Sequence, residues 1–183
     1  AVAAVCSGLR QTGTTASGVA VFAPASTVSL AAPATPVGVA VTSYPAYSSA
    51  YYYGGGPVFI ERSEVYHYVD RQYDDLSRDL RGTGATVIRR GENLVVQLPA
   101  DVTFAFDKSD IRPQFYGALN AFARSLEEYP ASDIEVIGHT DSVGSDAYNL
   151  ALSDRRGRSV ADFLVARRTD PRRLVVEAMG ETQ

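Results

Sequence analysis

The chain of 183 residues is predicted to fold as an α+β domain, with helices packed on one mixed sheet, preceded by a low-complexity tether and a helical arm. Three observations support this prediction. Charged residues begin abruptly near residue 60, a helical apolar period follows, and strand and helix patterns then alternate as β-α-β-α-β from Val102 onward. Such alternation places helices against a sheet. We therefore assign 1–60 to a low-complexity linker or processed N-terminal segment, 61–84 to the helical arm and 85–183 to the domain.

The linker prediction rests on composition. Residues 1–60 contain one charged side chain, Arg10, and prolines at positions 24, 33, 36, 45 and 57 interrupt the segment. No apolar period is present that could build a core, so a disordered or extended segment is expected. Short strands at Gly18–Phe22 and Val37–Val41 are the alternative.

The arm is predicted from helical spacing. Apolar residues recur at spacings of mostly three and four, and Gly82 and Gly84 follow as stop signals. The apolar residues are Val65, Tyr68, Val69, Tyr73, Leu76 and Leu80. This amphipathic helix is expected to be a solvated spacer or a packing arm, with a coiled-coil partner helix as the alternative.

The domain is expected to begin with strands. Ala85–Arg90 and Asn93–Leu98 read as a hairpin, because a two-residue connection that starts with Gly91 suits a type II′ turn. Val102–Phe106 is predicted as the next short strand.

Two helices and two strands complete the expected order. The first helix covers residues 112–129, with Pro113 in its first turn, where proline is tolerated. The strand Ile134–Gly138, a helix from Ser145 to about Arg168 and the strand Leu174–Ala178 follow.

Two motifs carry a resemblance to a known family. The first is Phe104-Ala105-Phe106-Asp107-Lys108-Ser109. The second is Ile137-Gly138-His139-Thr140-Asp141, followed by Gly144 and by Asn149-x-x-Leu152-Ser153-x-x-Arg156. Together they resemble the OmpA-like C-terminal peptidoglycan-binding domain, over about Leu98 to Gly180. The hairpin before them resembles the subfamily of outer-membrane lipoproteins that carry this domain.

The resemblance implies a binding protein without catalysis or a cofactor. Such domains bind peptidoglycan through the diaminopimelate of its stem peptide, and they anchor the outer membrane or an envelope protein to the cell wall. The implied location is the bacterial cell envelope, at the outer membrane and facing the periplasm. The membrane would be reached through a lipid or a partner protein. The formal net charge of −4 argues against nucleic acid as a partner.

The resemblance also implies a set of ligand contacts, which fall on Asp107, Thr140, Asp141, Asn149 and Arg156. The end of a diaminopimelate side chain carries an ammonium and a carboxylate on one carbon. An Asp accepts from the ammonium, and an Arg offers two parallel N–H groups to the carboxylate, so one of each makes a minimal clamp.

Each of these residues also has a structural interpretation. Asp141 and Arg156 could pair with each other, and Asp107 could belong to a helix-capping loop. Asn149 could be a capping or surface residue, and Thr140 could only anchor its loop.

Two other functions remain as alternatives. An envelope scaffold or assembly lipoprotein would hold its main protein partner through residues 1–81. A wall hydrolase would use His139 with Asp141, but no Ser or Cys elbow and no third metal ligand accompanies them, so neither catalysis nor a metal site is expected.

Three departures from the family pattern have consequences. Gly157 stands mid-helix where the family has alanine, at a cost of about 1 kcal/mol. The family's further helix and final strand with an Asn-Arg-Arg motif do not occur within residues 1–183, so the domain is expected to be C-terminally truncated. Cys6 is the candidate lipid attachment site, although a lipoprotein signal would need a small residue where Val5 stands.

Overall fold

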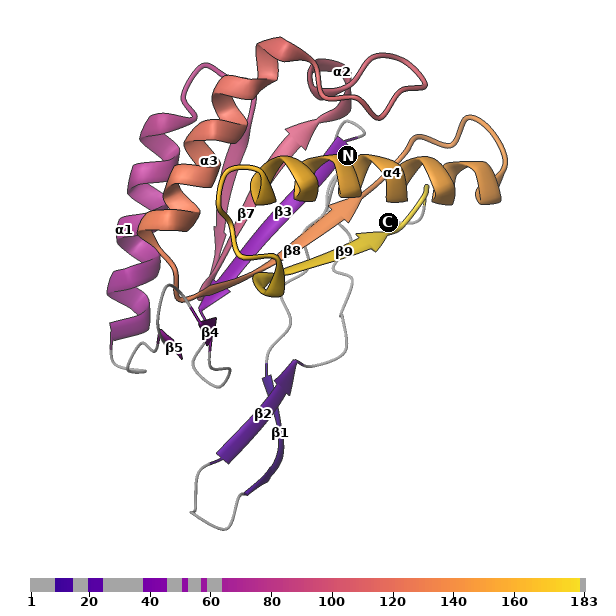
Figure 1. Ribbon diagram of the computed structural model, residues 1–183. Coiled ribbons are helices and arrows are strands. Elements are labelled where there is room, and N and C mark those ends of the chain that lie inside the picture. Colours follow the sequence, from indigo (N-terminus) through magenta and orange to yellow (C-terminus); the bar gives the residue numbers. More distant parts are fainter. Residues whose placement is uncertain are drawn as a thin grey trace.

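The computed structural model describes residues 9–14, 20–24, 38–45, 51–52, 57–58 and 64–181. Its main feature is a five-stranded sheet in the order β6-β7-β3-β8-β9 (Figure 1). The strands are β3 Gly38–Pro45, β6 Thr86–Arg90, β7 Asn93–Pro99, β8 Ser132–Gly138 and β9 Leu174–Ala178. β8 and β9 are parallel and the other neighbours are antiparallel, so the sheet is mixed.

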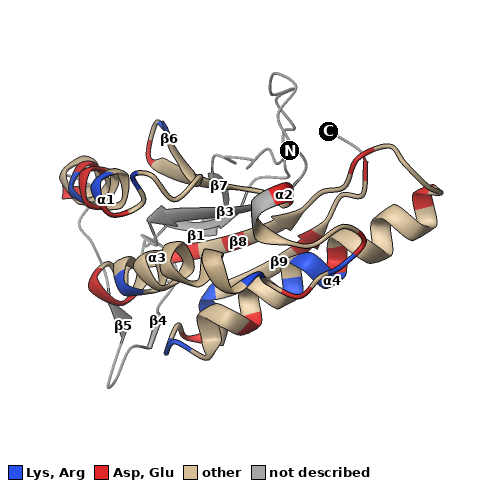
Figure 2. Cartoon of the chain, turned by 90° about the horizontal axis from the view of Figure 1, so that it is seen from above, with Lys and Arg blue, Asp and Glu red and all other residues tan. Residues whose placement is uncertain are grey.

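Three helices cover one face of this sheet. They are α1 Val65–Asp79, α3 Tyr116–Glu128 and α4 Asp146–Val165. Seen from above, they form one layer beside the strands, with acidic and basic residues interspersed (Figure 2). The fold class predicted from the sequence, α+β with helices on one mixed sheet, is confirmed.

Smaller elements complete the described chain. β1 Leu9–Thr14 pairs with β2 Ala20–Pro24, and β4 Tyr51–Tyr52 pairs with β5 Pro57–Val58. The 3-10 turns Pro113–Phe115 and Pro171–Arg173 precede α3 and β9.

The hairpin of β6 and β7 has the predicted turn. Arg90 pairs with Asn93, which leaves Gly91 and Glu92 as the connection. The backbone φ of Gly91 is +63°, whereas Glu92 has no positive φ. A type II′ turn requires this combination, so glycine at position 91 fixes the register of the hairpin.

The linker prediction is wrong for Gly38–Pro45, where the alternative of a short strand around Val37–Val41 is the one observed. This segment forms β3, which lies between β7 and β8 and is antiparallel to both. Backbone N–H and C=O groups along both neighbours need partners, and an extended segment rich in β-branched residues can supply them. Composition does not reveal such a long-range pairing. Cys6 and most of the remaining linker lie outside the described residues.

The strand predicted at Val102–Phe106 is also wrong. Residues Ala100–Thr103 form the short helix α2, in which the Thr103 hydroxyl donates to the Pro99 carbonyl at 2.7 Å. Phe104 makes only an isolated antiparallel bridge to Ile111. β3 already occupies the place beside β7, so no edge is free there for another strand.

The predicted arm belongs to the core. Val65, Val69, Leu76 and Leu80 are each at most 2% exposed, and α1 packs against α3, β6 and β7. Tyr129 directly follows α3, and its hydroxyl donates to the Asp75 carboxylate of α1 at 2.6 Å. The apolar face of the helix is therefore used inside the fold, and the boundary predicted at residue 85 does not separate it from the domain.

Two glycines bring α4 close to the sheet. A Cβ at Gly138 would overlap the Ser153 carbonyl oxygen, and one at Gly157 would lie 2.9 Å from Cγ1 of Val176. Gly157 therefore serves close packing, which accounts for a residue that costs helix stability. The Ser153 hydroxyl also accepts from the Gly180 N–H at 3.0 Å. These contacts fix the first half of α4 over the ends of β8 and β9.

Candidate functional site

A closed loop connects α2 to the turn before α3. The bridge between Phe104 and Ile111 closes it, and the Arg112 N–H donates to the Thr103 carbonyl at 2.8 Å. At its tip Asp107 has a φ of +59°, in the left-handed region that disfavours most side chains but tolerates Asp. The neighbouring Phe106 is 88% exposed. The loop therefore presents a carboxylate and an aromatic ring to solvent from a fixed base.

Arg156 extends from α4 toward this loop. The residue is only 6% exposed, its Nε donates to the Lys108 carbonyl at 3.0 Å, and its Cζ lies 5.2 Å from the centroid of the Phe104 ring. Burial lowers the pKa of the Arg156 guanidinium, while the nearby Asp141 and Asp107 carboxylates act in the opposite direction. The side chain is thus held through Nε and the ring, and its terminal Nη groups do not carry that contact.

The carboxylates near Arg156 do not pair with it. Among the described residues, no ion pair within 4.0 Å joins Arg156 to Asp141 or Asp107. Both aspartates are exposed, and Asp141 accepts only a long bond of 3.3 Å from the Val143 N–H. The structural ion pair that the sequence left open is therefore absent from this part of the chain. A buried cation without a close anion is costly unless something else compensates it.

These groups meet in a hollow of about 290 Å³. Asp141 and Arg156 line it, and the loop residues Phe104 and Phe106 form an aromatic wall. The other lining residues are Ala100, Asp101, Ala105 and Arg112. The folded chain brings the two predicted clamp residues together, and it places Asp107 close enough to raise the pKa of Arg156 against the effect of burial.

Thr140 and Asn149 are placed differently. They are 7% and 1% exposed and do not line the hollow. The Thr140 N–H donates to the Gly180 carbonyl at 2.8 Å, and Asn149 Nδ2 donates to the Glu181 carboxylate at 3.2 Å. Oγ1 of Thr140 and Oδ1 of Asn149 have no hydrogen-bond partner among the described residues. The surface interpretation of Asn149 is therefore wrong, because the segment after β9 covers this side chain.

The sequence did not single out Asp101, Phe106 or Arg112 as site residues. Its patterns place Arg112 only at the start of a helix, and Phe106 only in a strand and in the first family motif, without a ligand role. An arginine directly before a proline, near a loop with two aspartates, was the available signal in the sequence. It could not be interpreted without knowing that the loop closes beside α4.

His139 does not join this group. It is 4% exposed and does not line the hollow. Within residues that the structure describes, no three His, Cys, Asp or Glu side chains come together as a metal site. The described helices also include none with the length and apolar character needed to cross a bilayer.

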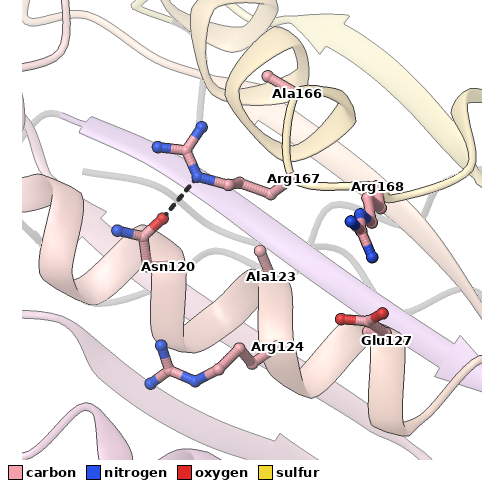
Figure 3. Close-up of a pocket in the computed structure, with 7 residues that line it drawn as sticks. All are labelled: Asn120, Ala123, Arg124, Glu127, Ala166, Arg167 and Arg168. Atoms are coloured by element: carbon pink, nitrogen blue, oxygen red, sulfur yellow. Dashed lines mark hydrogen bonds between the residues drawn. The ribbon is translucent and has the colours of Figure 1, made fainter.

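A second hollow, of about 330 Å³, lies between α3 and the end of α4. Figure 3 shows Asn120, Arg124 and Glu127 on the α3 side, and Arg167 and Arg168 on the other. Arg167 Nε donates to Asn120 Oδ1 at 2.8 Å. Arg167 and Arg168 are exposed and follow the C-terminus of α4, where cations interact favourably with the helix dipole. This hollow shares no lining residue with the first and is assigned no ligand.

Comparisons with known proteins agree with this architecture. The model of the OmpA family matches residues 103–183. The chain is 36% identical over 116 residues to the probable lipoprotein YiaD of Escherichia coli (strain K12), covering 63% of this chain and 53% of that protein. It is 44% identical over 89 residues to outer membrane porin F of Pseudomonas fluorescens, covering 49% of this chain and 27% of the porin.

A solved structure is also similar. It is the cell wall anchor of the T6SS from Pseudomonas aeruginosa, with 26% identity and a TM-score of 0.51. The match covers 63% of this chain and 80% of that one. By contrast, the chain spans about half of YiaD and about a quarter of the porin, so the activities of those whole proteins do not transfer directly.

Proposed function

We propose that the chain binds peptidoglycan without catalysis and anchors an envelope component to the cell wall, because the model of the OmpA family matches residues 103–183. The observation that carries the proposal is the state of Arg156. Its guanidinium is buried and fixed through Nε, and no described carboxylate pairs with it. Such an arrangement favours an anionic ligand that the folded chain does not itself supply.

The ligand that fits these charges is the zwitterionic end of diaminopimelate. Its carboxylate would accept from the terminal Nη groups of Arg156, because a guanidinium matches a carboxylate in two parallel hydrogen bonds. Its ammonium would be held by Asp141 and Asp107, the two carboxylates whose charges act on the pKa of Arg156. The Phe104 ring supports the guanidinium from one side.

Thr140 and Asn149 have an indirect part in this proposal. Both are buried beneath the segment that follows β9 and lie outside the hollow. Each has a buried oxygen without a described partner. We assign them to positioning the loop that carries Asp141, and they would reach the ligand only if Gly180 and Glu181 moved aside.

The names of the related proteins support a role in the cell envelope. One similar structure is described as a cell wall anchor, and the related sequences are described as a lipoprotein and an outer membrane porin. We propose that this chain likewise works in the bacterial envelope, at the outer membrane and facing the periplasm. Attachment to the membrane would occur through a lipid or a partner protein.

The test is sedimentation with insoluble peptidoglycan. Walls of the diaminopimelate type and of the lysine type are compared for the wild-type chain and for Arg156→Gln and Asp141→Asn. Arg124→Gln serves as the control, because it removes an exposed arginine that lines the other hollow. We expect retention on the first wall only, lost in both clamp variants and kept in the control. Equal retention on both walls, or retention in the clamp variants, would refute the clamp and favour a scaffold with a protein partner.

A further inference from the structure

The candidate site contains more charge than a single zwitterion uses. Asp141 and Arg156 account for one ammonium and one carboxylate. Asp101 and Arg112 line the same hollow and remain without a role. Because the aromatic walls of Phe104 and Phe106 also belong to this hollow, the unused pair lies beside a partly apolar surface.

Arg112 is held in place by its backbone. Its N–H donates to the Thr103 carbonyl at 2.8 Å, and its carbonyl accepts from the Phe115 N–H at 2.9 Å. The preceding residue, Ile111, makes the bridge that closes the loop. The backbone at Arg112 is therefore fixed before any ligand arrives, so that binding has to order only the side chain.

The Arg112 guanidinium has no anion beside it in the described part of the chain. No ion pair within 4.0 Å joins it to Asp101 or to any other described carboxylate. Arg112 is half-buried, whereas Asp101 is exposed at the start of α2. Of the two unused charges, the cation is thus the one more withdrawn from water, and a charged contact is stronger there.

We propose that Arg112 binds a second carboxylate of the same wall peptide, next to the diaminopimelate end held by Arg156. The hollow then recognises a peptide with two separated carboxylates rather than a single amino acid. A guanidinium is suited to this role because it offers its donors in a planar fork. This inference rests on the proposed function and specifies the ligand of that site.

Calorimetric titration of the full chain tests it with three probes. The first is free diaminopimelate. The second is a stem peptide that contains diaminopimelate and has a free carboxylate outside the diaminopimelate end that Arg156 holds. The third is the same peptide with that additional carboxylate amidated. We expect the free-carboxylate peptide to bind tightest. Arg112→Gln should lower its affinity roughly three- to tenfold, between the ranges for exposed and buried charged contacts. The affinity ratio of peptide to free diaminopimelate should fall accordingly, and Arg124→Gln should leave that ratio unchanged.

The outcomes separate this inference from the proposed function. If free diaminopimelate does not bind the wild type, the proposed function fails and this inference fails with it. If diaminopimelate binds but amidation or Arg112→Gln leaves the ratio unchanged, only the inference is overturned. Weaker peptide binding in Asp101→Asn, with no effect of Arg112→Gln, would mean that the second group is a cation and would also overturn it.

Discussion

Replacing Arg156 with methionine should separate binding from stability. The change removes the hydrogen bond to the Lys108 carbonyl, a contact of a charged group worth about 1.5–3 kcal/mol. It also removes a cation that is 6% exposed and has no described ion pair within 4.0 Å. Replacing buried ionic groups with well-packed apolar residues can raise stability by about 1–4 kcal/mol, because a charge no longer has to be buried. The two effects nearly cancel, so we expect the free energy of unfolding to change by less than about 1 kcal/mol.

Binding to peptidoglycan, by contrast, should be lost, because methionine offers no donor to a carboxylate. Urea denaturation measures the first quantity and peptidoglycan sedimentation the second. Arg173→Met is the matched comparison, since Arg173 is 2% exposed and donates to the carbonyls of Leu126, Tyr129 and Ser132 at 2.7–3.1 Å. Its loss should cost more than about 3 kcal/mol, because three buried carbonyls lose their charged donor. A loss of that size in Arg156→Met would show that Arg156 is structural and would refute this reasoning.

Three further predictions concern the frame of the site. Gly138→Ala should destabilise the fold by about 3 kcal/mol in urea denaturation, because its Cβ would overlap the Ser153 carbonyl; an unchanged midpoint would contradict the close packing. Asp107→Gly should change stability by less than about 1 kcal/mol, because relief of the φ of +59° is offset by the conformational entropy that glycine loses on folding, while wall retention weakens; a loss of more than about 2 kcal/mol would contradict this balance. Hydrogen bonds from Tyr129 and, to a smaller extent, Arg78 lower the pKa of Asp75 in the folded state. The ionised carboxylate therefore adds to the free energy of unfolding in full above its unfolded pKa of about 4, and this stabilisation is lost as the pH falls through the lower folded pKa. Asp75→Asn should therefore flatten the acid side of the stability curve, and an unchanged slope below about pH 4 would argue against this linkage.

Local pattern was sufficient for much of this fold. The apolar spacing predicted α1, α3 and α4, and a glycine in a two-residue connection predicted the hairpin of β6 and β7. The resemblance carried by the motif residues predicted that Asp141 and Arg156 share one site, and both line the same hollow. In each case the information lies within a few residues of chain, where periodicity and turn chemistry act.

The local sequence pattern did not predict features in which segments far apart in the chain compete for one place in the sheet or bury one another. Gly38–Pro45 reads as tether, yet it takes the place between β7 and β8, and Val102–Phe106 does not form a strand. Asn149 reads as a capping or surface residue until the segment after β9 buries it.

The sequence by itself therefore determined the helices and the hairpin, and it predicted Asp141 and Arg156 as the candidate pair. Only the tertiary structure decided which strand is central, which predicted contacts are buried and that Arg112 lies in the same hollow as Arg156. The physical reason is that strand pairing and burial depend on groups far apart along the chain. Their partners are set by the folded arrangement as a whole, and no short window of residues contains them.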